Sequence, residues 1–307
     1  MWTWARLGAG AAILAVVVGR LGAGPFVDGL RMTSPLALAA AASITVLTTV
    51  CCAWRWSLVA GGLGVDVRLR AAVAACYRSQ FLNATLPGGV VGDVHRAVRH
   101  GRDVGNVARS VRAVGWERSL GLAVQIVLTA TVLLLLPSPV PAPLPATAAT
   151  AAALGLVVVL VLGSPSGGLL GRVARAVTAD VRHALLRRRA WLGVGLASAT
   201  AVMGHAMVFL IAVRAAGTTA SAARLVPLAL IVLLASAVPT NIAGWGPREG
   251  AAAWAFSSAG LGAEQGVTVA VVYGVMALFA TLPGACLLLT AALAGSPPPA
   301  PPRRRRA

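Results

Sequence analysis

The chain has 307 residues, of which 58% are hydrophobic and only 11% charged, and its mean hydropathy is +0.83. Soluble domains carry about 25% charged residues, so this composition excludes a soluble globular protein and indicates an all-α integral membrane protein. At about 20 residues per crossing, the length accommodates a polytopic helical bundle of roughly eight spans and half-spans. The net charge of +18 comes from arginine alone. Because no soluble domain would present a basic face, we attribute this charge to cytoplasmic loops and expect no nucleic-acid partner.

The N-terminal part contains two apolar runs. The first, Leu7 to Gly24, follows a single basic residue, Arg6. A cleaved signal peptide and a retained span both fit this run, and we expect the span because a second run, Pro35 to Trp54, follows closely and would pair with it. The sequence Trp54-Arg55-Trp56 is typical of a membrane interface, and the basic segment Gly61 to Arg70 is expected in the cytoplasm.

The next apolar run, Ala71 to Leu86, is interrupted by polar side chains and is too short to cross a bilayer completely. Pro87-Gly88-Gly89 then breaks it. We expect a half-helix that enters the membrane and turns back at this break. A basic stretch follows and leads to Glu117-Arg118, at the mouth of the next span.

Three spans are expected in the middle of the chain, at Ser119 to Leu136, Leu144 to Gly163 and Trp191 to Val213. The uncharged, Pro-rich segment 137–145 reads as an outer loop. The loop from Ser164 to Ala190 carries six arginines, which makes it the strongest cytoplasmic marker in the chain.

The C-terminal part contains a second broken segment. The apolar run Leu225 to Val238 ends at a Gly/Pro-rich stretch, 239–250, and a second run, Ala251 to Leu261, follows. The last run, Val267 to Ala294, exceeds a bilayer core and contains Pro283, so we expect it to tilt or kink. We therefore expect one polytopic domain over 1–295 and a disordered basic tail over 296–307, with both termini in the cytoplasm.

The two breaks, one in each half, each pair a carboxylate with an arginine. The first leads to Asp93 and Arg96, and the second contains Arg248 and Glu249. Charge is costly in hydrocarbon, and irregular backbone at membrane depth survives only beside protein or a wet cavity. In transporters, broken segments at corresponding positions of two halves mark the substrate site. The alternative, interfacial loops with incidental ion pairs, fits the sequence as well.

Other kinds of site are not indicated. The four cysteines have no metal-ligand spacing, and the four histidines form no metal-binding motif. His205, which lies within a span, is expected to form a hydrogen bond between helices. Neither a GK[ST] phosphate-binding loop nor a GxSxG motif occurs. We expect no cofactor and no metal.

Three segments resemble motifs of one family, the lysylphosphatidylglycerol synthase transmembrane-region group of flippase-like bacterial membrane proteins. Residues 81–96 are similar to its N-x-x-x-P-G-G-x-G-G-D-x-x-R segment, with Val91 in place of a glycine. Glu117-Arg118 followed by Gly121-Leu122 resembles its E-R-x-x-G-L segment. Residues 244–250 resemble its G-G-W-G-x-R-E-G segment, with Ala243 where the first glycine stands.

The resemblance implies a helical bundle with re-entrant segments that moves lipid across the plasma membrane. In two-part relatives, a soluble C-terminal domain transfers an aminoacyl group to phosphatidylglycerol. This chain stops soon after its last span, so aminoacyl transfer by the chain itself is not expected. The expected partners are membrane lipids, anionic phospholipids above all, and a separate synthase is a further candidate.

The leading hypothesis is therefore a lipid translocator whose arginines contact the headgroup phosphate and whose carboxylates orient the arginines or bind the rest of the headgroup. The alternatives are a membrane enzyme that acts on a lipid-linked substrate and a non-catalytic partner of a lipid synthase. The candidate headgroup-binding residues are Asn83, Pro87, Gly88, Gly89, Asp93, Arg96, Glu117, Arg118, Asn241, Gly244, Trp245, Gly246, Arg248 and Glu249.

Overall fold

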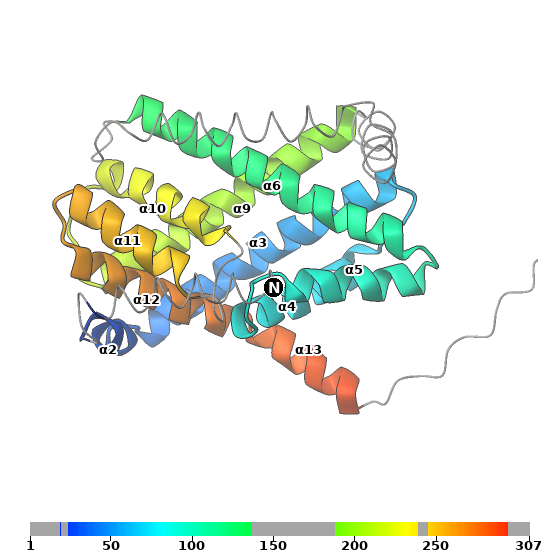
Figure 1. The fold of residues 1–307 in the computed structure, drawn as a ribbon, viewed down its shortest axis with the longest axis horizontal. Helices are drawn as coiled ribbons and strands as arrows, with labels where there is room; N and C mark the ends of the chain where they lie inside the picture. The colour runs from blue at the N-terminus through cyan, green and yellow to red at the C-terminus, as the bar shows by residue number, and fades with distance from the viewer. Residues whose placement is uncertain (1–18, 20–23, 137–187, 239–244, 294–307) are drawn as a thin grey trace, which may run out of the picture.

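The computed structural model describes residues 19, 24–136, 188–238 and 245–293 (Figure 1). The predicted runs Leu7 to Gly24 and Leu144 to Gly163 and the tail lie almost entirely outside these ranges. The described part is helical, which confirms the predicted all-α class, and four of its helical segments are long and apolar enough to cross a membrane. The described helices are α2 (Gly24–Arg31), α3 (Pro35–Gly62), α4 (Leu69–Thr85), α5 (Val91–Asp103), α6 (Val107–Leu135), α9 (Arg188–Ala215), α10 (Ala222–Ser236), α11 (Pro247–Ser258), α12 (Ala263–Ala280) and α13 (Leu282–Leu293).

Helix α3 continues through Trp54-Arg55-Trp56 and ends at Gly62, so it extends beyond the predicted run Pro35 to Trp54. Successive side chains on an α-helix point about 100° apart. Trp54 is 39% exposed on the outer surface, whereas Arg55 and Trp56 are only 5% and 1% exposed and face the interior. Arg55 is therefore a buried charge in a span.

Helix α6 begins earlier than predicted. The side chain of Asn106 accepts a hydrogen bond from the backbone N–H of Arg109 at 3.1 Å and caps the helix within the basic stretch. Glu117 and Arg118 consequently lie within α6, whose 29 residues extend beyond the predicted span Ser119 to Leu136 at its N-terminal end. Glu117 is buried at 1% exposure, whereas the side chain of Arg118 is 51% exposed.

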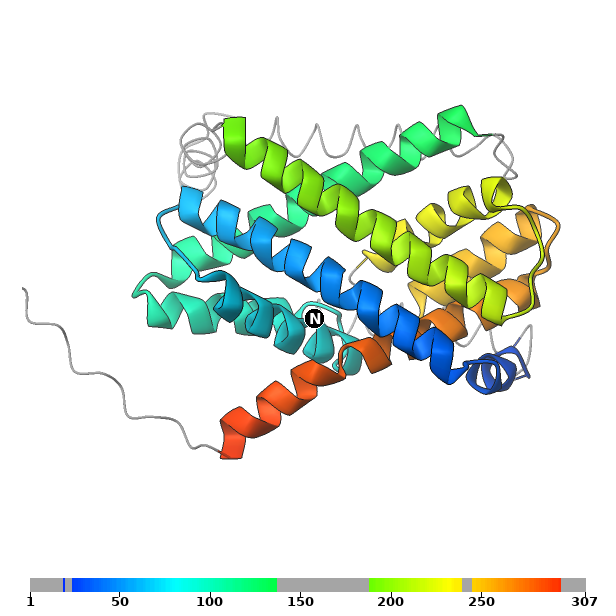
Figure 2. The same cartoon turned by 180° about the vertical axis from the view of Figure 1, so that it is seen from behind.

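Helices α4 and α5 form a hairpin that starts and ends on the same side of the molecule (Figures 1 and 2). Helix α4 runs from the α3–α4 loop to near the middle of the bundle, and α5 packs against it and returns. This topology agrees with the predicted half-helix that turns back. The hairpin starts from the end of the molecule that we call the basic end, which carries Arg68, Arg70, Arg99, Arg102 and Arg109.

Helices α10 and α11 form a second hairpin, which enters from the opposite end of the molecule (Figure 1). Helix α10 runs inward from the α9–α10 loop, and α11 returns to the α11–α12 loop at the same end (Figure 2). The order long helix, hairpin, long helix therefore occurs twice, as α3–α6 and as α9–α12, and the two groups run in opposite directions along the molecule. Inverted repeats of this kind are common among secondary transporters.

The last apolar run breaks where the proline predicts. Helix α12 ends at Ala280 and α13 begins at Leu282, one residue before Pro283. Gly284 then packs so closely on α4 that an added Cβ would lie 2.2 Å from the carbonyl oxygen of Tyr77. The break thus directs α13 against the first hairpin.

Candidate functional site

The turn of the α4–α5 hairpin is held by the first resemblance motif. Gly88 and Gly89 have φ values of 91° and 61°, which L-residues with a side chain rarely adopt. The side chain of Asn83 accepts from the N–H of Gly92 at 2.7 Å and donates to Asp93 Oδ2 at 3.1 Å, which joins the end of α4 to the start of α5. Val91, where the family motif has glycine, is 40% exposed and leaves the turn undisturbed.

Gly92 allows the two helices of this hairpin to touch. A Cβ at Gly92 would lie 2.0 Å from the carbonyl oxygen of Ser79, a contact that only backbone movement can relieve. We expect Gly92→Ala to separate α4 from α5 and to lower the melting temperature measured in detergent.

A matched control is Gly115→Ala in α6, where nothing lies within 4 Å of the added Cβ. Alanine favours a helix over glycine by about 1 kcal/mol, so this variant should melt at the same or a higher temperature. Equal melting of the Gly92→Ala and Gly115→Ala proteins would contradict the close contact.

Glu117 is the centre of a buried ion network. Its Oε1 atom accepts from Arg55, whose Nε lies at 2.9 Å and whose Nη2 is also in contact. Its Oε2 atom accepts from Arg96 Nη2 at 2.8 Å. Arg55 further donates to Ser198 on α9 at 3.0 Å. The network therefore ties α3, α5, α6 and α9 together.

Asp93 forms the second half of the network, at the first turn of α5. Its Oδ1 atom accepts from Ser79 at 3.0 Å, from Arg96 at 3.0 Å and from Arg118 at 2.8 Å. The guanidinium groups of Arg96 and Arg118 balance the Asp93 carboxylate, and with the bond from Asn83 both of its oxygens are occupied.

The ion network has an excess of positive charge. It contains three guanidinium groups, from Arg55, Arg96 and Arg118, and two carboxylates, so its net charge is +1. Arg96 is 3% exposed, and its Nε has no hydrogen-bond partner within the described part of the chain. The Arg118 side chain is 51% exposed while it holds Asp93, so the network opens to the surroundings at this one arginine.

The second hairpin carries a smaller ion pair at the start of α11. Glu249 is fully buried and accepts from Arg248 Nε at 2.8 Å, from Arg248 Nη2 at 2.6 Å and from the N–H of Gly246 at 2.6 Å. The Arg248 guanidinium lies 5.1 Å from the ring of Trp245 and 5.5 Å from the ring of Tyr273. Charge, hydrogen bonds and two aromatic faces thus fix Arg248 in one position.

Helix α9 connects the two sites. Ser198, which binds Arg55, and His205 are seven residues apart, so they lie on one helix face about 10 Å from each other. His205 Nδ1 lies 3.4 Å from the hydroxyl of Tyr273, the residue beneath Arg248. The predicted interhelical contact of His205 is present, and it places a polar group between the ion network and the α11 pair.

The structure brings Asn83, Asp93, Arg96, Glu117 and Arg118 into one cluster and Trp245, Gly246, Arg248 and Glu249 into another. Pro87, Gly88 and Gly89 form the hairpin turn, whereas Asn241 and Gly244 lie outside the described residues. The sequence interpretation missed the partners that other helices supply, namely Arg55, Ser79, Ser198 and Tyr273.

Where the structure is described, no group of three or more metal-ligating side chains occurs.

A bundle with inverted hairpins and charged side chains buried at their inner ends defines a polytopic membrane protein with a polar site in its interior. The family model of the lysylphosphatidylglycerol synthase transmembrane region matches residues 3–284, so the chain belongs to this family. A search of curated proteins found no match.

Proposed function

We propose that this protein translocates an anionic phospholipid across the cytoplasmic membrane and that the ion network receives the headgroup. The net charge of +1 in a largely buried cluster is the observation that carries this proposal. The excess arginine, Arg118, is half exposed, and a phosphate beside it would supply the missing negative charge. Both carboxylates are fully engaged with arginines, so their role is to orient the guanidinium groups.

Arg118 is the residue through which a headgroup would enter. It is the most exposed member of the network, and its guanidinium has donors beyond the one that binds Asp93. Guanidinium groups bind phosphate through two parallel hydrogen bonds. The acyl chains would stay in the bilayer beside α6 while the headgroup passes inward toward Ser198 and His205.

Two further features support transport of a lipid. The inverted hairpins correspond to the architecture in which transporters place a substrate between two halves. The family takes its name from a lipid synthase, which favours a phospholipid over a soluble anion. The arginines at the basic end would face the cytoplasm, in agreement with the positive-inside rule.

The test is a flipping assay in liposomes with labelled phosphatidylglycerol, phosphatidylethanolamine and phosphatidylcholine. We expect the protein to accelerate flipping of phosphatidylglycerol most. Arg118→Ala should reduce this rate at least about tenfold, because it removes a charge-assisted contact worth about 1.5–3 kcal/mol. Arg109→Ala, which removes an exposed arginine from the start of the same helix, is the matched control and should flip normally.

Equal rates in empty and protein-containing liposomes for all three headgroups would contradict translocation. Chemical turnover of a lipid by the purified protein would favour a membrane enzyme instead.

A further inference from the structure

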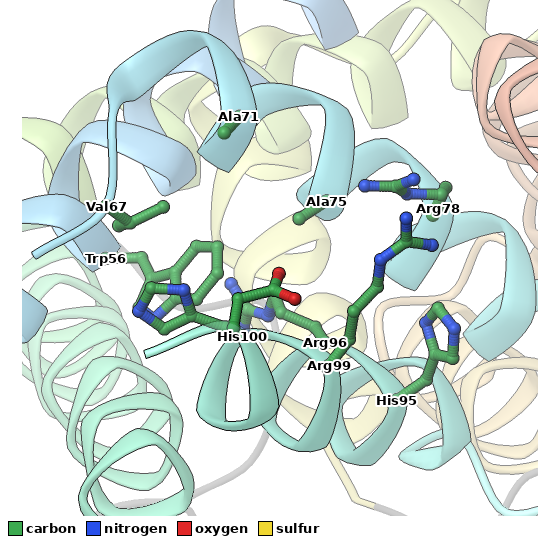
Figure 3. A pocket seen from close by; sticks show the side chains of 10 residues that line it. Trp56, Val67, Ala71, Ala75, Arg78, His95, Arg96, Arg99 and His100 are labelled. Carbon is green, nitrogen blue, oxygen red and sulfur yellow. The ribbon is translucent and has the colours of Figure 1, made fainter. Parts of the chain in front are cut away.

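A separate basic pocket lies between α4 and α5 at the basic end, beside Arg96 (Figure 3). Its volume is about 70 Å³, several times the roughly 10–15 Å³ that one water molecule requires. Its polar lining comes from Arg78, His95, Arg96, Arg99, His100 and Asp103. The ring of Trp56 forms one wall, with the Arg96 guanidinium 4.7 Å from its centre.

Arg78 and Arg99 direct their guanidinium groups toward each other across this pocket (Figure 3). Arg99 repels the guanidinium of Arg78, whereas the Asp103 carboxylate in the same lining attracts it. Within the described ranges, neither Arg78 nor Arg99 forms an ion pair or a side-chain hydrogen bond. The lining therefore sets the two arginines against one carboxylate, Asp103, and an anion between the arginines would stabilise this excess of positive charge.

The pocket continues into an open apolar depression along α5. This depression has a volume of about 460 Å³, is lined by Val91, Val94, Val98 and Arg102, and shares His95, Arg99 and Asp103 with the pocket. The three valines follow an i, i+3, i+7 spacing and therefore lie on one edge of the helix. Val94 is 58% exposed. A cationic pocket beside an exposed apolar edge matches an amphiphile with an anionic head.

We propose that the α4–α5 pocket binds the phosphate of an anionic phospholipid, with one acyl chain along Val91, Val94 and Val98. Arg78 and Arg99 hold the phosphate from two sides, and Arg96 adds positive charge at the inner wall. This site is distinct from the ion network, because Arg78 and Arg99 take no part in the network. It lies at the basic end, where it would receive lipid from one leaflet before any headgroup reaches Arg118.

The test uses the purified full-length chain in detergent with a short-chain phosphatidylglycerol that carries a photoactivatable diazirine in one acyl chain. After irradiation, cross-linked peptides are identified by mass spectrometry. We expect cross-links within 91–98 and their loss, by at least about tenfold, in Arg78→Gln and Arg99→Gln. Arg109→Gln, an equal loss of charge at the same end, should leave these cross-links unchanged, and Arg99→Lys should retain part of them.

Unlabelled phosphatidylglycerol should compete with the probe, whereas glycerol phosphate at equal concentration should not. Cross-links at 91–98 that persist in the Arg78→Gln, Arg99→Gln double variant would overturn the inference. If glycerol phosphate competes with the probe as well as unlabelled phosphatidylglycerol does, the pocket binds a free phosphate and not a lipid. The cross-linking experiment measures lipid binding at residues 91–98. Its result can therefore be interpreted even if the flipping assay shows no transport.

Discussion

Replacement of Glu117 by glutamine should have the largest effect of any single substitution in the ion network. The change leaves Arg55 and Arg96 buried without their shared carboxylate, and breaking a buried ion pair from one side costs about 3–5 kcal/mol. We expect a large fall in the melting temperature in detergent and loss of lipid flipping in whatever protein remains folded. The measurements are thermal unfolding followed by size-exclusion chromatography and the liposome assay.

Glu264→Gln is the matched control for this substitution. Glu264 is an exposed residue in the first turn of α12 and forms no ion pair with the described residues, so its replacement should leave melting and flipping close to those of the unmodified protein. A Glu117→Gln protein that melts like the Glu264→Gln protein would show that the network contributes little to the fold.

Glu249→Gln should have an effect of similar size in the second half. It leaves Arg248 charged at 8% exposure, between Trp245 and Tyr273, with its only ion-pair partner in the described structure removed. We expect destabilisation of about 3–5 kcal/mol and loss of flipping. Arg248→Met should also destabilise, because it leaves the Glu249 carboxylate unpaired.

The double variant Arg248→Met, Glu249→Gln separates stability from function. With both charges removed, no unpaired charge remains, so the melting temperature should recover toward that of the unmodified protein. Flipping should stay absent if Arg248 contacts the headgroup during passage. A double variant that recovers both properties would assign the α11 pair a structural role alone.

The sequence predicted the hairpin architecture well because its signals are local. Pro87-Gly88-Gly89 marks a turn that few other residues allow, and a polar run as short as Ala71 to Leu86 cannot span a bilayer. Pro283 is an equally local signal, and it correctly predicts the break in the last apolar run. Helix starts were less accurate, since Asn106 caps a helix whose first turns carry Arg109 and Arg112 and read as a basic loop.

The ion network could be predicted only in part. Asp93, Arg96, Glu117 and Arg118 lie near breaks in the apolar pattern, whereas Arg55 comes from a helix without a break. Its partner Glu117 is 62 residues away, and no local spacing reveals such a contact. One signal was available, because Arg55 continues a stripe of buried or partly buried residues with spacings of three and four along α3: Ala41, Thr45, Thr48, Cys52, Arg55 and Val59.

Tyr273 was missed for a related reason. It lies in an apolar helix as an ordinary aromatic residue, and only the folded chain brings its ring beneath Arg248 and its hydroxyl to His205. Gly274 beside it explains how the two helices fit, since a Cβ there would lie 2.4 Å from Arg248 Nη2.

The opposite directions of the two hairpins have a thermodynamic consequence. If the halves exchange conformations during a transport cycle, a form accessible from one leaflet becomes a form accessible from the other. Identical halves would make the two forms equal in energy. These halves differ, because the first contains a cluster of net charge +1 and the second a balanced pair. The empty protein should therefore rest with one side open, and an arriving anion would be what makes the second form accessible.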